Sequence, residues 1–180
     1  KLLADGTIRK THPGLQFDLS ALAKGYAIDK AANSLDGLGV QHYLIELGGE
    51  LRAKGNGFKG EGWQVGLEHP QATTYDPHIH RTISLNNSAV ATSGTYRLAF
   101  IDPVDDRAYS HIIDPRTGRP VKHGLIAVSV LAPTAMEADG WATALMVLGA
   151  EEGLRLAEDE NLVALFVQRT PSGVNVKTTA

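Results

Sequence analysis

The chain of 180 residues contains no cysteine, which excludes disulfide bonds, catalytic thiolates and zinc sites built from thiolates. It also lacks any apolar run near the eighteen residues that a membrane helix requires. Its net charge of -3 differs from the strongly basic balance typical of nucleic-acid-binding proteins, so we expect no nucleic-acid partner. An anionic small ligand stays compatible with this charge, because a bound cation and local Lys or Arg can outweigh it.

The remaining composition is that of an ordinary globular protein. Hydrophobic residues make up 43% of the chain and charged residues 21%, and a chain of this length can bury a core of ordinary size. We therefore expect one domain over residues 1–180. The chain begins at Lys1 without a methionine or a signal-peptide pattern, so we expect that a leader or an N-terminal region of a longer protein has been removed.

The order of the expected elements predicts an α+β fold, with a mostly antiparallel sheet and packed helices. Strands outnumber helices, and the two kinds alternate too irregularly for a repeated βαβ pattern. A short N-terminal hairpin is expected over 2–9, and a polar loop over 69–80. The expected strands are 43–47, 51–54, 63–68, 82–85, 89–92, 98–101, 107–113, 125–131, 162–168 and 174–177.

Three helices are expected. The first has Asp18 or Ser20 as its N-cap and ends at the glycines 37 and 39. The second begins with a capping box of Thr134 and Glu137 and runs to about Leu148, where Gly149 breaks it. A short third helix covers 151–157. The apolar stripe expected on the first helix consists of Leu22, Tyr26 and Ala27.

Asp139 and Thr143 are the strongest candidates for a metal site. They stand four residues apart and therefore share one face of the second helix, on which Met136 and Met146 also lie. A carboxylate on an apolar face is costly unless a partner compensates its charge. Mg²⁺ would do so, because it prefers carboxylate, hydroxyl and carbonyl oxygens. The alternative is that Asp139 only interacts favourably with the helix N-terminus.

His111 is the candidate for proton transfer. It stands where an apolar strand becomes the polar turn 114–120, and a histidine exchanges protons near neutral pH. The alternative is a surface histidine bonded to Asp114. No spacing among the other histidines suggests a metal site, and we take His78 and His80 as solvated. These other histidines are His12, His42, His69, His78, His80 and His123.

Small residues at strand ends are the third signal. Gly48-Gly49 follows Glu46 at the end of an expected strand, and glycines there let a ligand approach the backbone. The run 91–96 places small hydroxyl residues around Gly94, which suits phosphate or ribose contacts. Lys24 lies in the first helix, where its ammonium faces either a phosphate or water. Each of these patterns also suits an ordinary turn or a solvated helix face.

The order of these motifs along the chain resembles the ApbE family, the bacterial FAD:protein FMN transferases. The motifs are 18–29, 46–50, 91–96, the turn at His111, and 139–144. The similarity extends from about Thr7 to Val167. It implies an α+β, T-fold-like core and a Mg²⁺-dependent reaction. In that reaction the FMN part of FAD moves to a threonine or serine hydroxyl of a target flavoprotein subunit, and AMP is released.

The resemblance also implies roles for individual residues. Asp139 and Thr143 would bind the metal with the backbone carbonyl of Ala23, and His111 would accept the proton of the incoming hydroxyl. Gly140 stands where the family usually has alanine. The residues expected to line the FAD site are Lys24, Asp29, Glu46, Gly48, Gly49, Ser93, Gly94 and Thr95.

Two other activities remain open at this stage. The same site could use water and act as an FAD pyrophosphatase that gives FMN and AMP, or it could be a non-catalytic FAD-binding module. Family members are considerably longer than 180 residues, so we expect a core that lacks their N-terminal part. The resemblance further implies a location at the periplasmic face of the bacterial inner membrane, through a lipid anchor that these residues do not include.

Overall fold

The computed structural model describes residues 1–68, 79–95, 99–101, 108–171 and 173–179. In this part of the chain, six strands form one sheet in which every neighbouring pair is antiparallel. In sheet order they are β1 (Tyr43–Leu47), β2 (Glu50–Lys54), β5 (Ser88–Gly94), β10 (Leu125–Ala132), β11 (Val163–Thr170) and β12 (Gly173–Thr178). The expected α+β fold with a mostly antiparallel sheet is thus confirmed.

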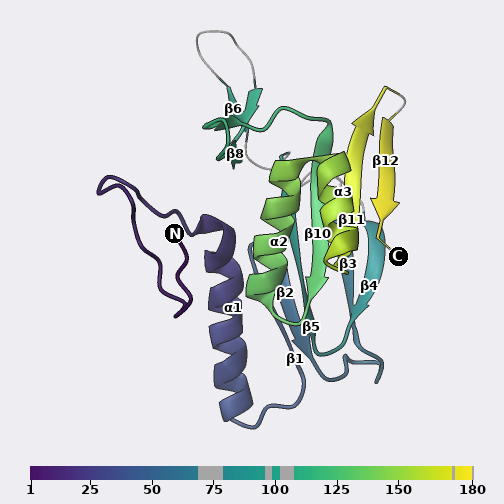
Figure 1. Cartoon of the computed structure of the whole chain (residues 1–180). Coiled ribbons are helices and arrows are strands. Elements are labelled where there is room, and N and C mark those ends of the chain that lie inside the picture. The colour runs from purple at the N-terminus through teal and green to yellow at the C-terminus, as the bar shows by residue number, and fades with distance from the viewer. Residues whose placement is uncertain (69–78, 96–98, 102–107, 172, 180) are drawn as a thin grey trace.

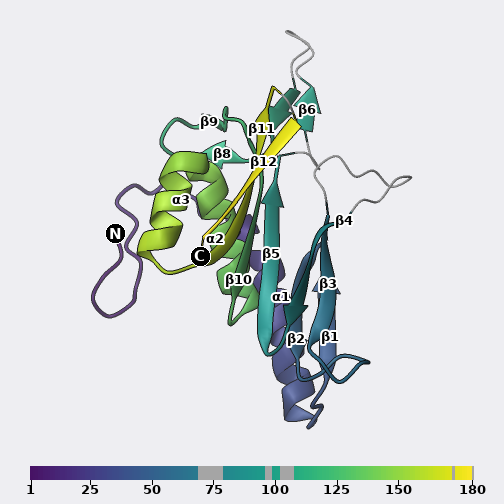
Figure 2. The ribbon, with the colours of Figure 1, turned by 90° about the vertical axis from the view of Figure 1, so that its right-hand side faces the viewer.

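The helices and a two-stranded ribbon cover opposite faces of this sheet (Figures 1 and 2). The helices are α1 (Ser20–Gly37), α2 (Ala135–Leu148) and α3 (Ala150–Asp159). The ribbon is formed by β3 (Trp63–Glu68) and β4 (Ile79–Leu85). Two small ribbons complete the described elements: β6 (Ala99–Ile101) with β7 (Ala108–Ser110), and β8 (Ile113–Asp114) with β9 (Arg119–Pro120).

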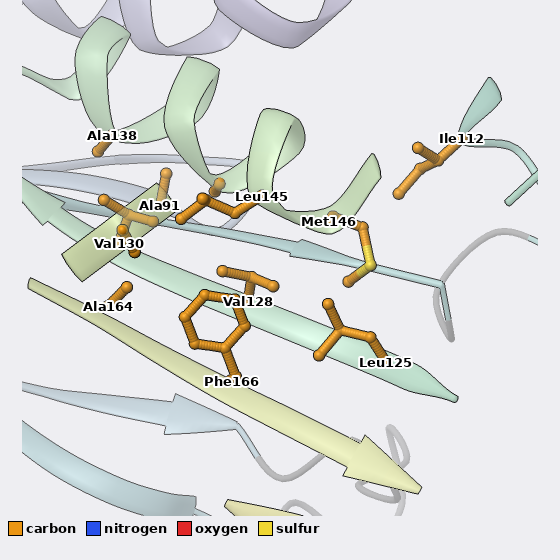
Figure 3. Packing of buried hydrophobic residues seen from close by; sticks show 12 residues of the cluster. Ala91, Ile112, Leu125, Val128, Val130, Ala138, Leu145, Met146, Ala164 and Phe166 are labelled. Atoms are coloured by element: carbon orange, nitrogen blue, oxygen red, sulfur yellow. The ribbon is translucent and has the colours of Figure 1, made fainter. Parts of the chain in front are cut away.

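Strand alternation divides the core between the two faces. Val128 and Val130 of β10 belong to the buried cluster under α2 and α3, together with Phe166 of β11, as Figure 3 shows. Ala127 and Leu165 face the other way and pack in the cluster beneath the ribbon. Because successive side chains point to opposite faces of a sheet, the apolar run in β10 is buried on both sides. This explains its continuous hydrophobicity in the sequence.

The N-terminus of α2 is capped from two directions. The Glu137 N–H donates to Thr134 Oγ1 over 3.2 Å, and Thr134 Oγ1 donates to Glu137 Oε2 over 2.8 Å, which confirms Thr134 as the N-cap and its pairing with Glu137. The Ala135 and Met136 N–H groups donate to the carboxylate of Asp29 in α1, each over 2.9 Å. Three of the four N–H groups that a helix leaves unpaired at its start are therefore satisfied, and α1 and α2 are fixed relative to each other.

The predicted apolar stripe of α1 was wrong. Leu22 and Tyr26 are exposed, whereas the buried face consists of Gly25, Ile28 and Ala32. Gly25 lies on this face because α2 approaches too closely at that position for any side chain. The predicted N-cap, Asp18 or Ser20, was also wrong.

The residue at the N-cap of α1 is Leu19, which has no side-chain oxygen. Asp18 still stabilises the helix start, because its Oδ1 accepts a hydrogen bond from the Ser20 N–H over 2.7 Å. The expected N-terminal hairpin exists as a single bridge between Leu2 and Ile8.

Two strand predictions also need correction. The expected strand 107–113 ends at Ser110, and a bend at residues 111–112 separates β7 from β8. The strand expected from 82 begins earlier, at Ile79, so His80 lies in β4 rather than in a loop. Residues 69–78 of the expected loop 69–80, residue 96 of the run 91–96, residue 98, the turn 102–106 and residue 107 lie outside the described residues.

None of the helices in the described ranges has both the length and the apolar composition that crossing a membrane requires.

Candidate functional site

The close packing of α1 against α2 begins at Gly25. A Cβ placed on Gly25 would lie 2.3 Å from the backbone oxygen of Ala135 and 2.6 Å from the Cα of Met136. No real side chain fits there, so glycine is required for this helix contact. The contact lets the Gly25 N–H donate to Asp139 Oδ2 over 3.0 Å. Two residues that are 114 positions apart in the sequence therefore meet in the core of the site.

Asp139 is a buried carboxylate, with 3% of its surface exposed. Burial raises its pKa above the ordinary range for aspartate, although the Gly25 N–H and the charge of Lys24 act in the opposite direction. Met146 on the same helix face is buried, whereas Met136 is exposed. A carboxylate in this environment favours a bound cation. Burial removes the favourable interaction of the charged carboxylate with water, and a cation replaces that interaction.

Thr143 lies one helical turn after Asp139 and meets a second hydroxyl. Its Oγ1 and the Oγ of Ser93 share a hydrogen bond of 2.9 Å. Ser93 pairs with Val128 in the sheet, so its side chain points to the face that α2 covers. The end of β5 thus supplies an oxygen donor next to the helix. Gly94 and Thr95 follow directly, and the Thr95 N–H donates to the carbonyl of Ile126 over 3.0 Å.

The turn between β1 and β2 lies beside α1. Leu47 pairs with Glu50, so Gly48 and Gly49 form a two-residue loop, and both have positive φ angles, +63° and +102°. Such loops require residues that tolerate the left-handed region. The Gly49 N–H donates to Glu46 Oε1 over 2.7 Å, which gives Glu46 a role in holding this turn.

Glu50 is the residue that sequence reasoning missed. Only 2% of its surface is exposed, and its Oε1 accepts a hydrogen bond from Lys24 Nζ over 2.7 Å. Its Oε2 is buried without a hydrogen-bond partner among the described residues. Burial raises the pKa of Glu50, Lys24 lowers it, and the nearby Asp139 raises it further. In the sequence, Glu50, Arg52 and Lys54 place a charged residue at every second position of the strand. This pattern is typical of a strand face that is exposed to solvent.

These contacts bring residues of α1, the β1–β2 turn, β5 and α2 into one group, which we call the α1–α2 site. Its members are Lys24, Gly25, Gly48, Glu50, Ser93, Asp139 and Thr143. Of the residues expected to line a ligand, the structure therefore brings together Lys24, Gly48 and Ser93 with the metal candidates Asp139 and Thr143.

Asp29 has a different environment. Its carboxylate accepts from the first two N–H groups of α2 and from Arg52. These partners belong to the fold and connect α1, β2 and α2. Its expected place in an FAD site stays a prediction, and any ligand contact would have to share a carboxylate that already accepts three donors.

His111 lies in the bend between β7 and β8 and is exposed. The next residue, Ile112, is buried in the same cluster as Ala142 and Met146 of α2, and Figure 3 shows it beside the end of α2 that carries Met146. The turn that follows is held by Arg116, which donates to the carboxylate of Asp114. The histidine bend thus lies next to the C-terminal half of α2.

The donor groups fit Mg²⁺ only as a partial set. The described residues contain no group of three His, Cys, Asp or Glu side chains that could hold a metal. Asp139 provides one buried carboxylate, Thr143 provides a hydroxyl, and Ala23 lies in the first turn of α1, next to Lys24. Mg²⁺ is often bound through one or two carboxylates, with substrate phosphates and water completing its octahedron. The site therefore suits a cation that arrives with a phosphate ligand.

Fold and site together define an α+β domain with a buried carboxylate, Asp139, one helical turn before the hydroxyl of Thr143. The profile of the ApbE family matches residues 1–166. The chain belongs to the ApbE family.

Relatives of known structure or curated function agree with this assignment. The FAD:protein FMN transferase of Haemophilus influenzae is 41% identical over 174 residues, which are 97% of this chain and 49% of that protein. The apo crystal structure of Pseudomonas stutzeri flavinyl transferase ApbE is similar with a TM-score of 0.77 and 41% identity, over 91% of this chain and 49% of that chain. The flavin transferase ApbE of Vibrio cholerae is similar with a TM-score of 0.82 and 38% identity, over 97% and 54%. The chain spans about half the length of the curated relatives it matches.

Proposed function

We propose that this protein is an FAD:protein FMN transferase. It moves the FMN part of FAD to a threonine or serine hydroxyl of a target protein and releases AMP. The names of the relatives support flavin transfer. The Mg²⁺ requirement is proposed from the donor groups of the α1–α2 site and from the family resemblance, and the type of acceptor residue and the leaving group are proposed from the family resemblance alone.

The observation that carries this proposal is the buried carboxylate of Asp139 one helical turn before the hydroxyl of Thr143. Phosphoryl-type transfer depends on positioning and on neutralising charge more than on covalent help from the enzyme. A Mg²⁺ held by these two side chains would supply electrostatic stabilisation of the pyrophosphate. Lys24 adds a second positive charge beside the same carboxylate.

The chain's own groups would act as follows. The acceptor hydroxyl oxygen forms a bond to the FMN phosphorus, the phosphorus–oxygen bond of the pyrophosphate breaks, and AMP leaves with that bonding pair. His111 takes the proton of the hydroxyl, for which its place in an exposed bend is suitable, because a protein target must reach it. The glycines of the β1–β2 turn let the nucleotide approach the backbone.

The expected partners are FAD and a target flavoprotein subunit that carries the acceptor residue. We also propose that the protein acts at the periplasmic face of the bacterial inner membrane, on the basis of the family resemblance. Cell fractionation with an antibody to the native protein would test this location.

The function is tested by incubating the intact protein with FAD, Mg²⁺ and a candidate target domain. The expected product is a target whose mass increases by that of FMN minus water, together with AMP. Free FMN and AMP without a modified target would instead identify an FAD pyrophosphatase. FAD binding without any turnover would identify a non-catalytic flavin-binding module.

A matched variant links the activity to the site. We expect Asp139→Ala to abolish Mg²⁺-dependent turnover while the circular dichroism spectrum stays that of the folded protein. Normal turnover by this variant would show that the cation binds elsewhere.

A further inference from the structure

Three ion pairs connect α1 with β2, and one of them is reversed. Residues 50, 52 and 54 alternate along β2, so their side chains face α1 together. In two pairs the helix supplies the acid and the strand the base, and in the third the helix supplies the base. The pairs are Asp36–Lys54, Asp29–Arg52 and, reversed, Lys24–Glu50.

The reversed pair also differs in burial. The side chains of Lys54 and Asp36 are 32% and 36% exposed, which is typical of an ordinary surface pair. The side chain of Glu50 is 2% exposed, and its second oxygen has no hydrogen-bond partner in the described part of the chain. Burying a carboxylate that is only half satisfied costs stability. Stabilisation of the fold therefore does not explain why an acid stands at this position.

The side chain of Lys24 is bonded to Glu50 and is also partly exposed. Its Nζ donates to Glu50 Oε1 over 2.7 Å, yet 46% of its side chain remains exposed. An ammonium group has three N–H donors, so two are left for another acceptor. Its charge acts on Asp139, and its side chain runs 3.6 Å from the position of a Cβ on Gly48. A free lysine is a flexible point charge, whereas this one has a fixed location.

We propose that Glu50 is a positioning residue. It fixes the ammonium of Lys24 between the β1–β2 turn and Asp139, where the open donors meet a phosphate oxygen of the bound nucleotide. The inference rests on the proposed function, because it takes FAD as the nucleotide. Glu50 itself does not touch the ligand.

A double-mutant cycle separates this role from the alternatives. FAD affinity is measured by quenching of flavin fluorescence, with Mg²⁺ present, for wild type, Lys24→Met, Glu50→Gln and the double variant. We expect each single change to weaken FAD binding on the order of tenfold, as loss of a charge-assisted hydrogen bond does. In the Lys24→Met background, Glu50→Gln should weaken binding no further.

The control is Asp36→Asn, which breaks the exposed pair between the same two elements. It should leave FAD affinity unchanged. Glu50→Asp provides a second arm in case Glu50→Gln fails to fold: it keeps the charge, retracts the carboxylate by one methylene, and should weaken FAD binding only while Lys24 is present.

Each other result overturns the inference. If Glu50→Gln or Glu50→Asp leaves FAD affinity unchanged, Glu50 has only a structural role. If either weakens binding equally with and without Lys24, Glu50 contacts the ligand or the metal itself. If wild type binds no FAD, the proposed function and this inference both fail. If wild type binds FAD but the effects of the Lys24 and Glu50 substitutions on FAD affinity are independent of each other, only the inference fails.

Discussion

At the scale of single residues, the site contains two carboxylates that oppose folding. Burial raises the pKa of Asp139 and of Glu50, so the native state binds more protons than the unfolded chain above about pH 4. Stability then falls as the pH rises from that value through the native-state pKa. The fold is therefore destabilised by its own site at neutral pH, a common relation between stability and function.

Asp139→Asn should stabilise the protein when no divalent cation is present. The amide removes the buried charge and can still accept from the Gly25 N–H. We expect the free energy of unfolding to increase on the order of 1 kcal/mol, or about 2–4 °C in Tm at pH 7. We also expect it to decline less steeply than in wild type as the pH rises from about 4 to 7. Thermal unfolding in a chelator over this pH range measures both effects.

The control for this prediction is Asp36→Asn. The hydrogen bond from Lys54 lowers the pKa of the Asp36 carboxyl, which is the opposite direction, so removal of its charge should bring no gain at pH 7. A lower Tm for Asp139→Asn than for wild type in chelator would contradict the argument.

His111→Ala should slow FMN transfer while FAD binding is kept. Loss of a general base typically costs about 10²–10⁴-fold in rate, and the residue lies in an exposed bend rather than in the core. Transfer rates at saturating FAD, together with FAD affinity, measure the two effects separately. His12→Ala, in the exposed N-terminal segment, is the control, and unchanged kinetics for His111→Ala would remove this histidine from the mechanism.

At the scale of elements, the helix pair α1–α2 determines the site. Asp29 joins the start of α2 to α1, and Gly25 permits the close approach that gives Asp139 its backbone donor. The buried face of α1 therefore has a glycine where it meets α2, together with Ile28 and Ala32. The apolar residues Leu22 and Tyr26 lie on the exposed side of the helix, so the expected stripe did not identify the buried face.

Gly25→Ala should destabilise the protein and disturb the site. The added methyl would meet backbone atoms of α2, which cannot rotate away, and overpacking of this kind costs about 1–3 kcal/mol. Gly37→Ala is the matched control, since nothing lies within 4 Å of its Cβ position in the same helix. It should leave stability unchanged or raise it by up to about 1 kcal/mol. Urea unfolding of both variants tests the difference, and equal stabilities would contradict the close helix contact.

At the scale of the whole molecule, ligand binding should couple distant elements of the chain. The α1–α2 site joins residues from α1, β2, β5 and α2, so a bound nucleotide and cation would stabilise all of them together. The prediction that residues 1–180 form one core domain stays a prediction, as does the activity of a chain of this length.

FAD and Mg²⁺ together should raise the Tm of the protein more than the sum of their separate effects. A ligand at 100 times its Kd stabilises the folded state by about 2.7 kcal/mol, and the proposed cation site is completed by the nucleotide. Differential scanning fluorimetry with each ligand alone and with both measures this. Equal shifts with and without Mg²⁺ would show that the nucleotide binds independently of the metal.

The sequence by itself determined the local features. The apolar run of β10, the capping residues Thr134 and Glu137, and the break at Gly149 all appear in the structure where they were expected. The spacing of Asp139 and Thr143 placed them on one helix face, because helix geometry depends only on neighbours along the chain.

Only the tertiary structure decided which charged groups became buried. Glu50 belongs to an alternating charged strand, and Asp29 was expected to line the FAD site, whereas it caps the start of α2. Their environments are set by contacts across 26 and 106 positions of the chain. Burial and pKa depend on what packs against a side chain from elsewhere in the fold, and no local pattern carries that information.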